Sequence, residues 1–384
     1  MEAFGLAAFL VSLSSALPLE IRQGDRVLLL GNTFLEREGS HGWIETALTR
    51  RFPGRATFRN LAWSADTVFL QLRPNGYPSL EAQLEQLRPT LILVSFAMME
   101  ALDGGAGLAS FVKAYDAYLN RLSGTKARIV LLSPIPHEAK GPPFPDPAAH
   151  NRSLGLYHEA IRTLACKRSV VFLDLYKPLL RPLVPVTENG IHPSSSGYAL
   201  IARVMEDALE LPPSHWNLQL EASGKVLSAV GLEISELKAE KTILRFRTRG
   251  EMLPMPHDEP CRLRVTGLAA GNYALEVDGS SVLTRASDEW ARGVELARGP
   301  AHERTELLRQ AIVKKNALCF LRWRPQNAEY IYGTRSRLEG ANVGNPQFES
   351  EFQLIERVIS VAEEKIAGVA SLTSHLHELR RVGN

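Results

Sequence analysis

The chain has 384 residues, of which 45% are hydrophobic and 22% charged, and its formal net charge is +2. This length predicts two domains rather than one small core. The near-neutral charge, without a long Lys/Arg block, excludes a broad basic surface for nucleic acid. Cys166, Cys261 and Cys319 lie far apart, which excludes a disulfide framework and a metal site of closely spaced cysteines.

The first residues carry an ambiguous targeting signal. Phe4 to Leu17 form an apolar run that ends in small residues, a pattern typical of a cleaved export signal over residues 1–16. The preceding Glu2 is acidic rather than basic, and the run is too short to span a bilayer comfortably. We expect a secreted or periplasmic protein, with a cytoplasmic protein that has a short packed start as the alternative. No later segment predicts an integral membrane span.

Residues 17–211 are expected to form one α/β domain. Short apolar runs predict buried strands at residues 26–30, 56–61, 90–96, 128–132 and 170–175. Amphipathic patterns between the runs predict helices over residues 42–51, 80–87, 107–122, from about 151, and over 194–210. Strands that alternate with helices predict a parallel sheet covered on both faces. Ligands of such sheets bind at the carboxyl ends of the strands, so the informative residues should follow each strand.

The pattern changes after Pro212-Pro213. Short alternating runs punctuated by Gly and Pro predict a small antiparallel β domain over residues 212–286. Helical patterns return over residues 288–298, 303–322 and 348–372. We therefore expect residues 287–384 to form a helical C-terminal extension.

Four blocks follow predicted strands in chain order: Gly31-Asn32-Thr33, Trp63-Ser64-Ala65-Asp66-Thr67, Ala97-Met98-Met99-Glu100 and Asn189-Gly190-Ile191-His192-Pro193. Their order and spacing resemble the SGNH/GDSL hydrolases, whose blocks supply a Ser nucleophile, a Gly backbone N–H, an Asn amide and an Asp-x-x-His pair. The resemblance covers about residues 24–210. It implies a flavodoxin-like three-layer α/β/α fold with a five-stranded parallel sheet, an esterase activity and no cofactor. The segment Arg322-Trp323-Arg324-Pro325-Gln326-Asn327 and the two-part layout resemble long GDSL-like proteins of planctomycetes.

The first three blocks depart from the family pattern. Thr33 stands at the nucleophile position, where its extra methyl group crowds attack and restricts χ1. Asn32 replaces the family's Asp and is expected to hold the turn by side-chain to backbone bonds. Ala65 replaces Gly, so its N–H is retained as an oxyanion donor only if the backbone angles are not restricted to Gly. Met99 replaces Asn, and the loss of one oxyanion donor typically costs about 10²–10³ in rate.

In the last block only His192 matches the family outright, as the general base. Asn189 stands at the acid position and can orient the ring, but a neutral amide does not stabilise an imidazolium. The equivalent change in a serine protease lowers turnover by about 10⁴. Glu188 can replace the acid only if the loop turns it inward. Glu100, at the same rim, either binds a polar substrate or opens the next helix, where acids suit the helix dipole.

Each of these assignments has a simpler alternative. Thr33 and Asn189 also suit ordinary turns, Ala65 also suits plain packing, and His192 also suits an exposed loop. His41, His137 and His150 are expected in loops near the rim, and we predict no metal site because no acidic or cysteine residues with metal-ligand spacing surround them. The large aromatic side chains Trp43 and Trp63 are either core residues or platforms for a sugar.

The sequence therefore favours an SGNH/GDSL-like esterase with a degraded catalytic set. Its expected substrate is an acyl ester on a carbohydrate or another small polar carrier, a class that rests on family analogy alone. The alternative is a catalytically inactive member that binds a glycan or a protein partner through the inherited cleft. Oligomeric state is not specified by the sequence.

Overall fold

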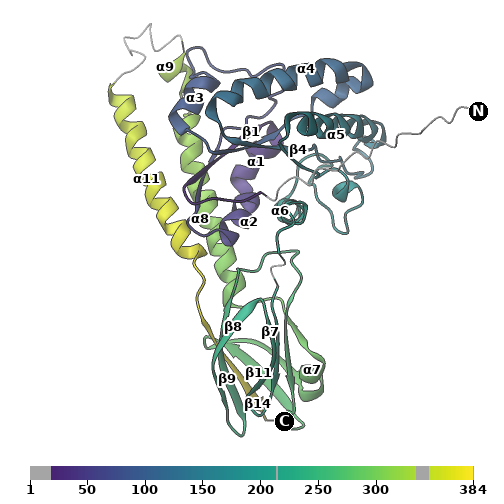
Figure 1. Ribbon diagram of the computed structural model, residues 1–384, viewed down its shortest axis with the longest axis vertical. Helices are drawn as coiled ribbons and strands as arrows, with labels where there is room; N and C mark the ends of the chain where they lie inside the picture. The colour runs from purple at the N-terminus through teal and green to yellow at the C-terminus, as the bar shows by residue number, and fades with distance from the viewer. Residues whose placement is uncertain (1–18, 213–214, 334–345, 384) are drawn as a thin grey trace, which may run out of the picture.

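The computed structural model describes residues 19–212, 215–333 and 346–383 (Figure 1). The predicted export segment lies outside the described residues. An α/β domain forms one end of the molecule and a β-rich domain the other, and the long helix α8 (Pro300–Trp323) connects them. In the part of the chain that the structure describes, no helix is long and apolar enough to cross a membrane.

A parallel sheet forms the centre of the α/β domain and has the strand order β2-β1-β3-β4-β5. The strands are β1 (Asp25–Gly31), β2 (Ala56–Asn60), β3 (Leu91–Ser95), β4 (Arg128–Leu132) and β5 (Val171–Leu173). All neighbouring strands pair in parallel. Every residue of β3 is buried, as expected for the middle strand of a sheet covered on both faces. The predicted five-stranded flavodoxin-like order is thus confirmed.

Helices cover both faces of this sheet because successive strand residues point to opposite sides. Leu29 and Leu93 pack with α1 (Thr33–His41), α2 (Trp43–Arg51) and α6 (Ser195–Ala208). Leu28 and Ile92 pack with α3 (Leu80–Leu87), α4 (Gly104–Leu122) and α5 (Ala148–Arg168) on the other face. Short 3₁₀ helices lie at Glu100–Asp103, Ser123–Thr125 and Pro178–Leu180. The result is a three-layer α/β/α domain.

The turn from β1 into α1 depends on a glycine. Gly31 has φ +146°, and a Cβ atom there would lie 2.1 Å from the carbonyl oxygen of Ser95 on β3. The backbones of β1 and β3 can approach at this point only because Gly31 has no side chain.

We expect Gly31→Ala to lower the free energy of unfolding by about 1–3 kcal/mol, because the added methyl group forces the two strands apart. Urea unfolding followed by circular dichroism measures the change. Gly124→Ala is the matched control, since a Cβ atom at Gly124 meets no atom within 4 Å and its φ is not positive. Equal unfolding midpoints for the two variants would contradict the proposed close approach.

The second domain consists of two packed sheets. One has the strand order β13-β10-β6-β7 and the other β12-β11-β14-β9-β8. Their strands are β6 (Asn217–Glu221), β7 (Lys225–Val230), β8 (Leu232–Ala239), β9 (Ile243–Gly250), β10 (Cys261–Thr266), β11 (Asn272–Val277), β12 (Ser280–Ala286), β13 (Val294–Leu296) and β14 (His375–Val382). The expected antiparallel pairing holds except between β10 and β6, which run parallel.

The C-terminal segment is not purely helical, although residues 287–384 were expected to form a helical extension. It contains α7 (Ser287–Arg292), α8, α9 (Ala328–Tyr332) and α11 (Pro346–Ala370), but β13 and β14 belong to the β-rich domain. β14 pairs with β11 on one side and β9 on the other. In Figure 1, α8 rises along the α/β domain and α11 returns beside it toward the β-rich domain.

α8 is anchored to the α/β domain by a buried ion pair. The Nζ atom of Lys315, which is fully buried, lies 2.9 Å from the carboxylate of Glu45 on α2 and 3.2 Å from the carbonyl oxygen of Phe58 on β2. Burial raises the pKa of Glu45, while the charge of Lys315 opposes that rise. The end of α8 also packs on the α/β domain, because Trp323 is buried and its carbonyl oxygen accepts a hydrogen bond from Tyr77.

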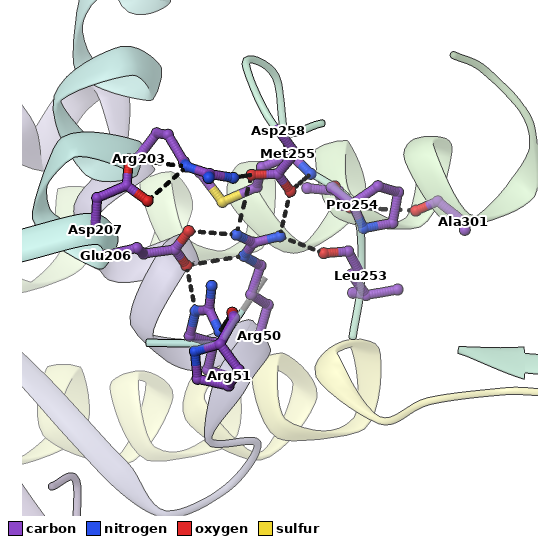
Figure 2. A network of polar contacts seen from close by, with 12 residues as sticks. Arg50, Arg51, Arg203, Glu206, Asp207, Leu253, Pro254, Met255, Asp258 and Ala301 are labelled. Carbon is purple, nitrogen blue, oxygen red and sulfur yellow. Dashed lines mark hydrogen bonds and ion pairs between the residues drawn. The ribbon is translucent and has the colours of Figure 1, made fainter. Parts of the chain in front are cut away.

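A second buried ionic network joins the two domains (Figure 2). The guanidinium of Arg50 on α2 is fully buried and contacts Glu206 on α6 at 2.5 Å and Asp258 at 2.7 Å. It also donates to the carbonyl oxygen of Leu253 at 2.6 Å. Residues 253–258 precede β10 of the β-rich domain, so this network fixes that domain against the helices of the α/β domain.

Candidate active site

The nucleophile candidate lies where β1 turns into α1. Asn32 is the N-cap of α1, and its side-chain oxygen accepts a hydrogen bond from the N–H of Phe34 at 3.1 Å. This is the turn-holding role expected for Asn32. Thr33 is the first residue of the helix and is half-buried at the carboxyl edge of the sheet. A capped helix start therefore presents the Thr33 hydroxyl at the predicted rim.

The N–H group of Ala65 meets this hydroxyl. It donates to Thr33 Oγ1 at 3.3 Å from the turn that follows β2. Ala65 has φ +65°, the left-handed conformation that glycine adopts most readily. The replacement of Gly by Ala has therefore left the N–H in place beside Thr33, at the cost of a backbone conformation that is less favourable for alanine.

The block after β3 divides into a structural residue and an exposed one. Glu100 is buried, and its two carboxylate oxygens accept hydrogen bonds from the N–H groups of Val68 at 2.8 Å and Ala97 at 3.0 Å. Burial raises the pKa of Glu100, which these backbone donors partly offset. Glu100 thus joins the loops after β2 and β3. Met99 is 42% exposed at the rim and, as a thioether, donates no hydrogen bond there.

The loop before α6 is held by a residue that the sequence did not single out. The carboxylate of Glu138, in the loop after β4, accepts hydrogen bonds from the N–H of Val186 at 2.8 Å, from the N–H of Thr187 at 2.7 Å and from the Thr187 hydroxyl. Burial alone would raise the pKa of Glu138, but these donors lower it overall. Its own N–H donates to the carbonyl oxygen of Gly190 at 2.8 Å. These bonds fix the segment that carries Asn189 and His192.

Asn189 contacts His192 through its amide nitrogen. Its side-chain oxygen accepts hydrogen bonds from the N–H groups of Ile191 at 3.1 Å and His192 at 2.9 Å. These two donors fix the orientation of the amide, so the NH₂ group is the one that lies 3.0 Å from His192 Nδ1. Because an NH₂ group only donates, Nδ1 must accept, and the proton of the neutral imidazole is on Nε2.

This tautomer is the opposite of the one that a catalytic base requires. In a Ser-His-Asp triad the acid accepts the Nδ1 proton, which leaves Nε2 free to take the proton of the nucleophile. Here His192 Nε2 carries a proton and is a donor. Burial and the charge of Arg37 lower the pKa of His192, and Glu188 opposes that shift. The imidazole is therefore held neutral, with Nε2–H directed away from Asn189.

Glu188 does not contact His192 as a replacement acid would. Its carboxylate is half exposed and pairs with Arg37 on α1 at 3.3 Å. Within the described residues it makes no hydrogen bond to the imidazole of His192. The ion pair links α1 to the His192 loop, and one turn into α6 the hydroxyl of Tyr198 donates to the carbonyl oxygen of Phe34 at 2.6 Å.

The structure therefore brings Ala65 to Thr33 and Asn189 to His192, and the Arg37–Glu188 ion pair links α1 to the loop that carries His192. In the part of the chain described, no hydrogen bond joins Thr33 to His192, as is common for catalytic pairs without substrate. Next to the loop lies an open depression of about 510 Å³, lined by residues that include His137, Glu138 and Leu183. This depression leaves solvent access beside the His192 loop.

Two further imidazoles lie near this edge. The rings of His137 and His150 are 4.5 Å apart, and the Nε2 atoms of both are buried without a hydrogen-bond partner. Burial, together with His150 and His192, lowers the pKa of His137 to about 4, so it is neutral at physiological pH. In the described residues no group of three or more His, Cys, Asp or Glu side chains is arranged to hold a metal ion. His137 lies in a loop as expected, whereas the expectation of loops was wrong for His41, the last residue of α1, and for His150, which lies in α5.

Neither tryptophan considered as a sugar platform has a free ring. Arg73 and Arg324 lie over the ring of Trp63 at 4.2 and 3.8 Å from its centroid. Trp43 is buried beneath Arg309, and its Nε1–H donates to Ser195 Oγ at 3.0 Å. Both side chains therefore belong to the packing between the α/β domain and α8 or α6.

Comparison with known proteins identifies a family match over the α/β domain that contains the candidate residues. Residues 30–200 match the model of the GDSL-like Lipase/Acylhydrolase family. A gut microbial diltiazem-metabolizing enzyme is similar in structure, with a TM-score of 0.75 and 18% identity, over 96% of this chain and 100% of that chain. That likeness shows that the whole two-part layout, helices and β-rich domain included, recurs as one fold. An acetylxylan esterase from Geobacillus stearothermophilus has a TM-score of 0.40 and 15% identity, over 50% of this chain and 98% of its own. No curated protein sequence matches the chain.

Proposed function

Because the chain belongs, through residues 30–200, to the GDSL-like lipase and acylhydrolase family, we propose that it hydrolyses acyl esters with a slow catalytic set. Thr33 Oγ1 attacks the ester carbonyl carbon, and the carbonyl oxygen takes up the negative charge. The N–H groups of Ala65 and Thr33 stabilise that oxyanion. His192 accepts the Thr33 proton at Nε2 and returns it to the departing alcohol, and water then releases the acid from Thr33.

The observation that carries this proposal is the contact between Thr33 Oγ1 and the Ala65 N–H at 3.3 Å. This contact supports the proposal because a hydroxyl and a backbone N–H that can serve as oxyanion donor lie together at the carboxyl end of β1, where such sheets bind their ligands. Burial and nearby charges hold His192 neutral, as a general base must be. The carbohydrate or other polar carrier of the acyl group remains a prediction from the family.

The orientation of Asn189 explains why turnover should be slow. For His192 to act as base, its proton must move from Nε2 to Nδ1, where it faces the NH₂ group of Asn189. In the flipped orientation of the Asn189 amide, the NH₂ group would face the N–H groups of Ile191 and His192. In the present orientation these two N–H groups donate to the side-chain oxygen of Asn189. Either arrangement sets donor against donor. The reactive tautomer is therefore a minor species.

The same geometry favours a second candidate function, an inactive member of the family that binds its ligand. With the proton on Nε2, His192 is a donor, and the Ala65 N–H is another donor at the same edge. Such a pair suits a ligand oxygen that accepts two hydrogen bonds, for example the hydroxyl of a glycan or a peptide carbonyl. Hydrolysis measurements decide between the two functions.

We expect the protein to hydrolyse p-nitrophenyl acetate and acetylated sugars slowly, with Thr33→Ala at the uncatalysed rate. His192→Ala should lower kcat/KM by about 10²-fold or more, the usual contribution of a general base. Thr33→Ser should raise kcat, because it removes the methyl group that crowds attack. Spectrophotometric detection of nitrophenolate and chromatographic detection of acetate measure these rates.

Thr163→Ala, which removes an exposed hydroxyl on α5, is the control and should match the wild-type rate. Turnover that survives both Thr33→Ala and His192→Ala would remove this mechanism. If the wild type shows no turnover but retains glycan binding that His192→Ala weakens, the binding function stands in its place.

A further inference from the structure

One cavity in the described part of the chain has none of the candidate catalytic residues in its lining. It is a cavity of about 670 Å³ between the α/β domain and α8. Its walls come from the carboxyl ends of β1 and β2, from α1, from the loop between β2 and α3, and from α8. Cavities of this size hold small organic ligands. The C-terminal segment therefore contributes to a candidate binding site, because α8 forms one wall of a cavity large enough for a small ligand.

The cavity begins one helical turn from the Thr33 hydroxyl. Glu36 and Ser40 line it, and they lie three and seven residues after Thr33 on α1, on the same helix face. Gly31 and Trp63 also line the cavity, and the N–H of Trp63 donates to the carbonyl oxygen of Gly31 at 2.9 Å. Ala65, which contacts Thr33, follows Trp63 by two residues. The cavity is therefore adjacent to the proposed reacting centre.

Most of the wall is aromatic or aliphatic. The aromatic residues that line it are Trp63, Tyr77, Tyr118, Phe320 and Trp323. The Tyr77 hydroxyl is already bonded to the carbonyl oxygen of Trp323 at 2.7 Å. An apolar group of a ligand would therefore meet a largely apolar surface, although two arginines lie over the ring of Trp63.

The charged groups of the wall occur in pairs. The guanidinium of Arg73 contacts both oxygens of Asp66, at 2.8 and 2.6 Å. Arg121 contacts Glu81 at 2.7 Å, and Arg324 contacts Glu36 at 3.3 Å. Each cation of the wall has a carboxylate partner, although Glu81 lies outside the lining, so the charges at the cavity are balanced by ion pairs. An ionised ligand would bring an uncompensated charge into a partly buried site.

Arg324 nevertheless keeps hydrogen-bond donors available. Both of its terminal nitrogens lie 3.3 Å from the same oxygen of Glu36, whose other oxygen accepts from Ser64 at 2.7 Å. A guanidinium has five N–H donors, and in the described residues that of Arg324 makes no other hydrogen bond. Its carbon lies 3.8 Å from the ring centroid of Trp63 and 4.7 Å from that of Phe320, so the group is held by stacking.

We propose that this cavity holds the uncharged apolar arm of the substrate, an aryl or long acyl group that carries a carbonyl or ether acceptor for Arg324. The link to Thr33 rests on the proposed hydrolysis, whereas the binding of the arm does not. The substrate would then be a bulky ester rather than a simple acetate of a small polar carrier.

Binding is tested with 2-acetonaphthone, an uncharged aromatic ketone that cannot be hydrolysed, and with 2-naphthoate as its anionic counterpart. Tryptophan fluorescence is the readout, because Trp63 and Trp323 line the cavity. We expect saturable quenching by the ketone and at least tenfold weaker binding of the naphthoate. Tighter binding of the naphthoate would overturn the uncharged ligand class.

Variants of α8 and of Arg324 locate the site. Ala317 lines the cavity and is exposed, so Ala317→Trp fills space without crowding the core and should weaken ketone binding at least tenfold. The control Leu307→Trp, at a 59% exposed position of α8 outside the lining, should change it less than twofold. Arg324→Lys keeps the charge but loses the planar donors, and should weaken ketone binding several-fold. Equal binding by Ala317→Trp and the wild type would overturn the pocket.

Hydrolysis of 2-naphthyl acetate and ethyl acetate separates this proposal from the proposed function. We expect the wild type to have a lower KM for the naphthyl ester than for ethyl acetate. Ala317→Trp should remove this difference in KM and leave the hydrolysis of ethyl acetate unchanged. If neither ester is hydrolysed and the ketone still binds as expected, the hydrolase proposal fails and the pocket stands. If both esters are hydrolysed with the same KM in the wild type and in Ala317→Trp, the pocket proposal fails and the hydrolase stands.

Discussion

Asn189→Asp is expected to raise kcat/KM for ester hydrolysis by about 10²–10⁴, the reverse of the loss that Asp-to-Asn causes in a serine protease. One carboxylate oxygen can keep the hydrogen bonds from the N–H groups of Ile191 and His192. The other then accepts from His192 Nδ1, which moves the imidazole proton to Nδ1 and leaves Nε2 free to act as base. The new charge also stabilises the imidazolium that forms in the reaction. Steady-state kinetics with p-nitrophenyl acetate measure the gain.

The pH profile distinguishes this effect from a change in packing. In the wild type, burial and Arg37 lower the pKa of His192, so the acid limb of the rate profile should lie below the ordinary value of about 6.5. In Asn189→Asp the carboxylate favours the imidazolium, and the acid limb should move to higher pH. Asn189→Ala should show neither the gain nor this shift. The tautomer argument is refuted if Asn189→Asp is no faster than the wild type while its circular dichroism spectrum is unchanged.

Arg50→Met is expected to lower the free energy of unfolding by about 3–5 kcal/mol, the usual cost of breaking a buried ion pair. The substitution leaves the carboxylates of Glu206 and Asp258 buried with fewer donors, although Arg51 and Arg203 still contact them. It also removes the donor to the Leu253 carbonyl oxygen. Urea unfolding followed by circular dichroism and by tryptophan fluorescence measures the loss.

The control for this variant is an exposed ion pair of similar length. Arg292 and Asp288 on α7 lie 2.8 Å apart, with side chains 71% and 70% exposed. Arg292→Met should cost less than about 1 kcal/mol, since water already solvates both charges. Similar losses for Arg50→Met and Arg292→Met would show that the junction in Figure 2 does not depend on this network.

The α/β domain was predictable because its strands are nearly continuous apolar runs, and the runs at residues 128–132 and 170–175 correspond to β4 and β5. The strand β14 could not be predicted from the sequence. Its apolar residues Leu376, Leu379 and Val382 are three residues apart, which does not alternate as a half-buried strand should. In the sheet it is His377 and Leu379 that are buried, so an imidazole occupies a core position. Burial lowers the pKa of that imidazole to about 4.

The site was predictable only as a set of positions. Strand ends indicate where Thr33, Ala65 and His192 should lie, because parallel strands direct their carboxyl ends to one edge. They do not show that Asn189 offers its NH₂ group to the imidazole, because that orientation depends on backbone N–H groups of the folded loop. The sequence did not predict that Glu138 fixes the loop that carries His192, because its hydrogen-bond partners are about 50 residues away in the sequence.

The position of β14 in the middle of its sheet has a consequence for biosynthesis. The ribosome completes residues 19–212 first, and that domain can fold as soon as it emerges. The neighbours of β14 are β9 and β11. They cannot close their sheet until β14 has been synthesised, more than 90 residues after β11 ends. Until then both strands present unpaired edges that other chains could join. Chaperones would therefore meet an incomplete β-rich domain until β14 is made, and a stop codon before His375 should be far more harmful than the short lost strand suggests.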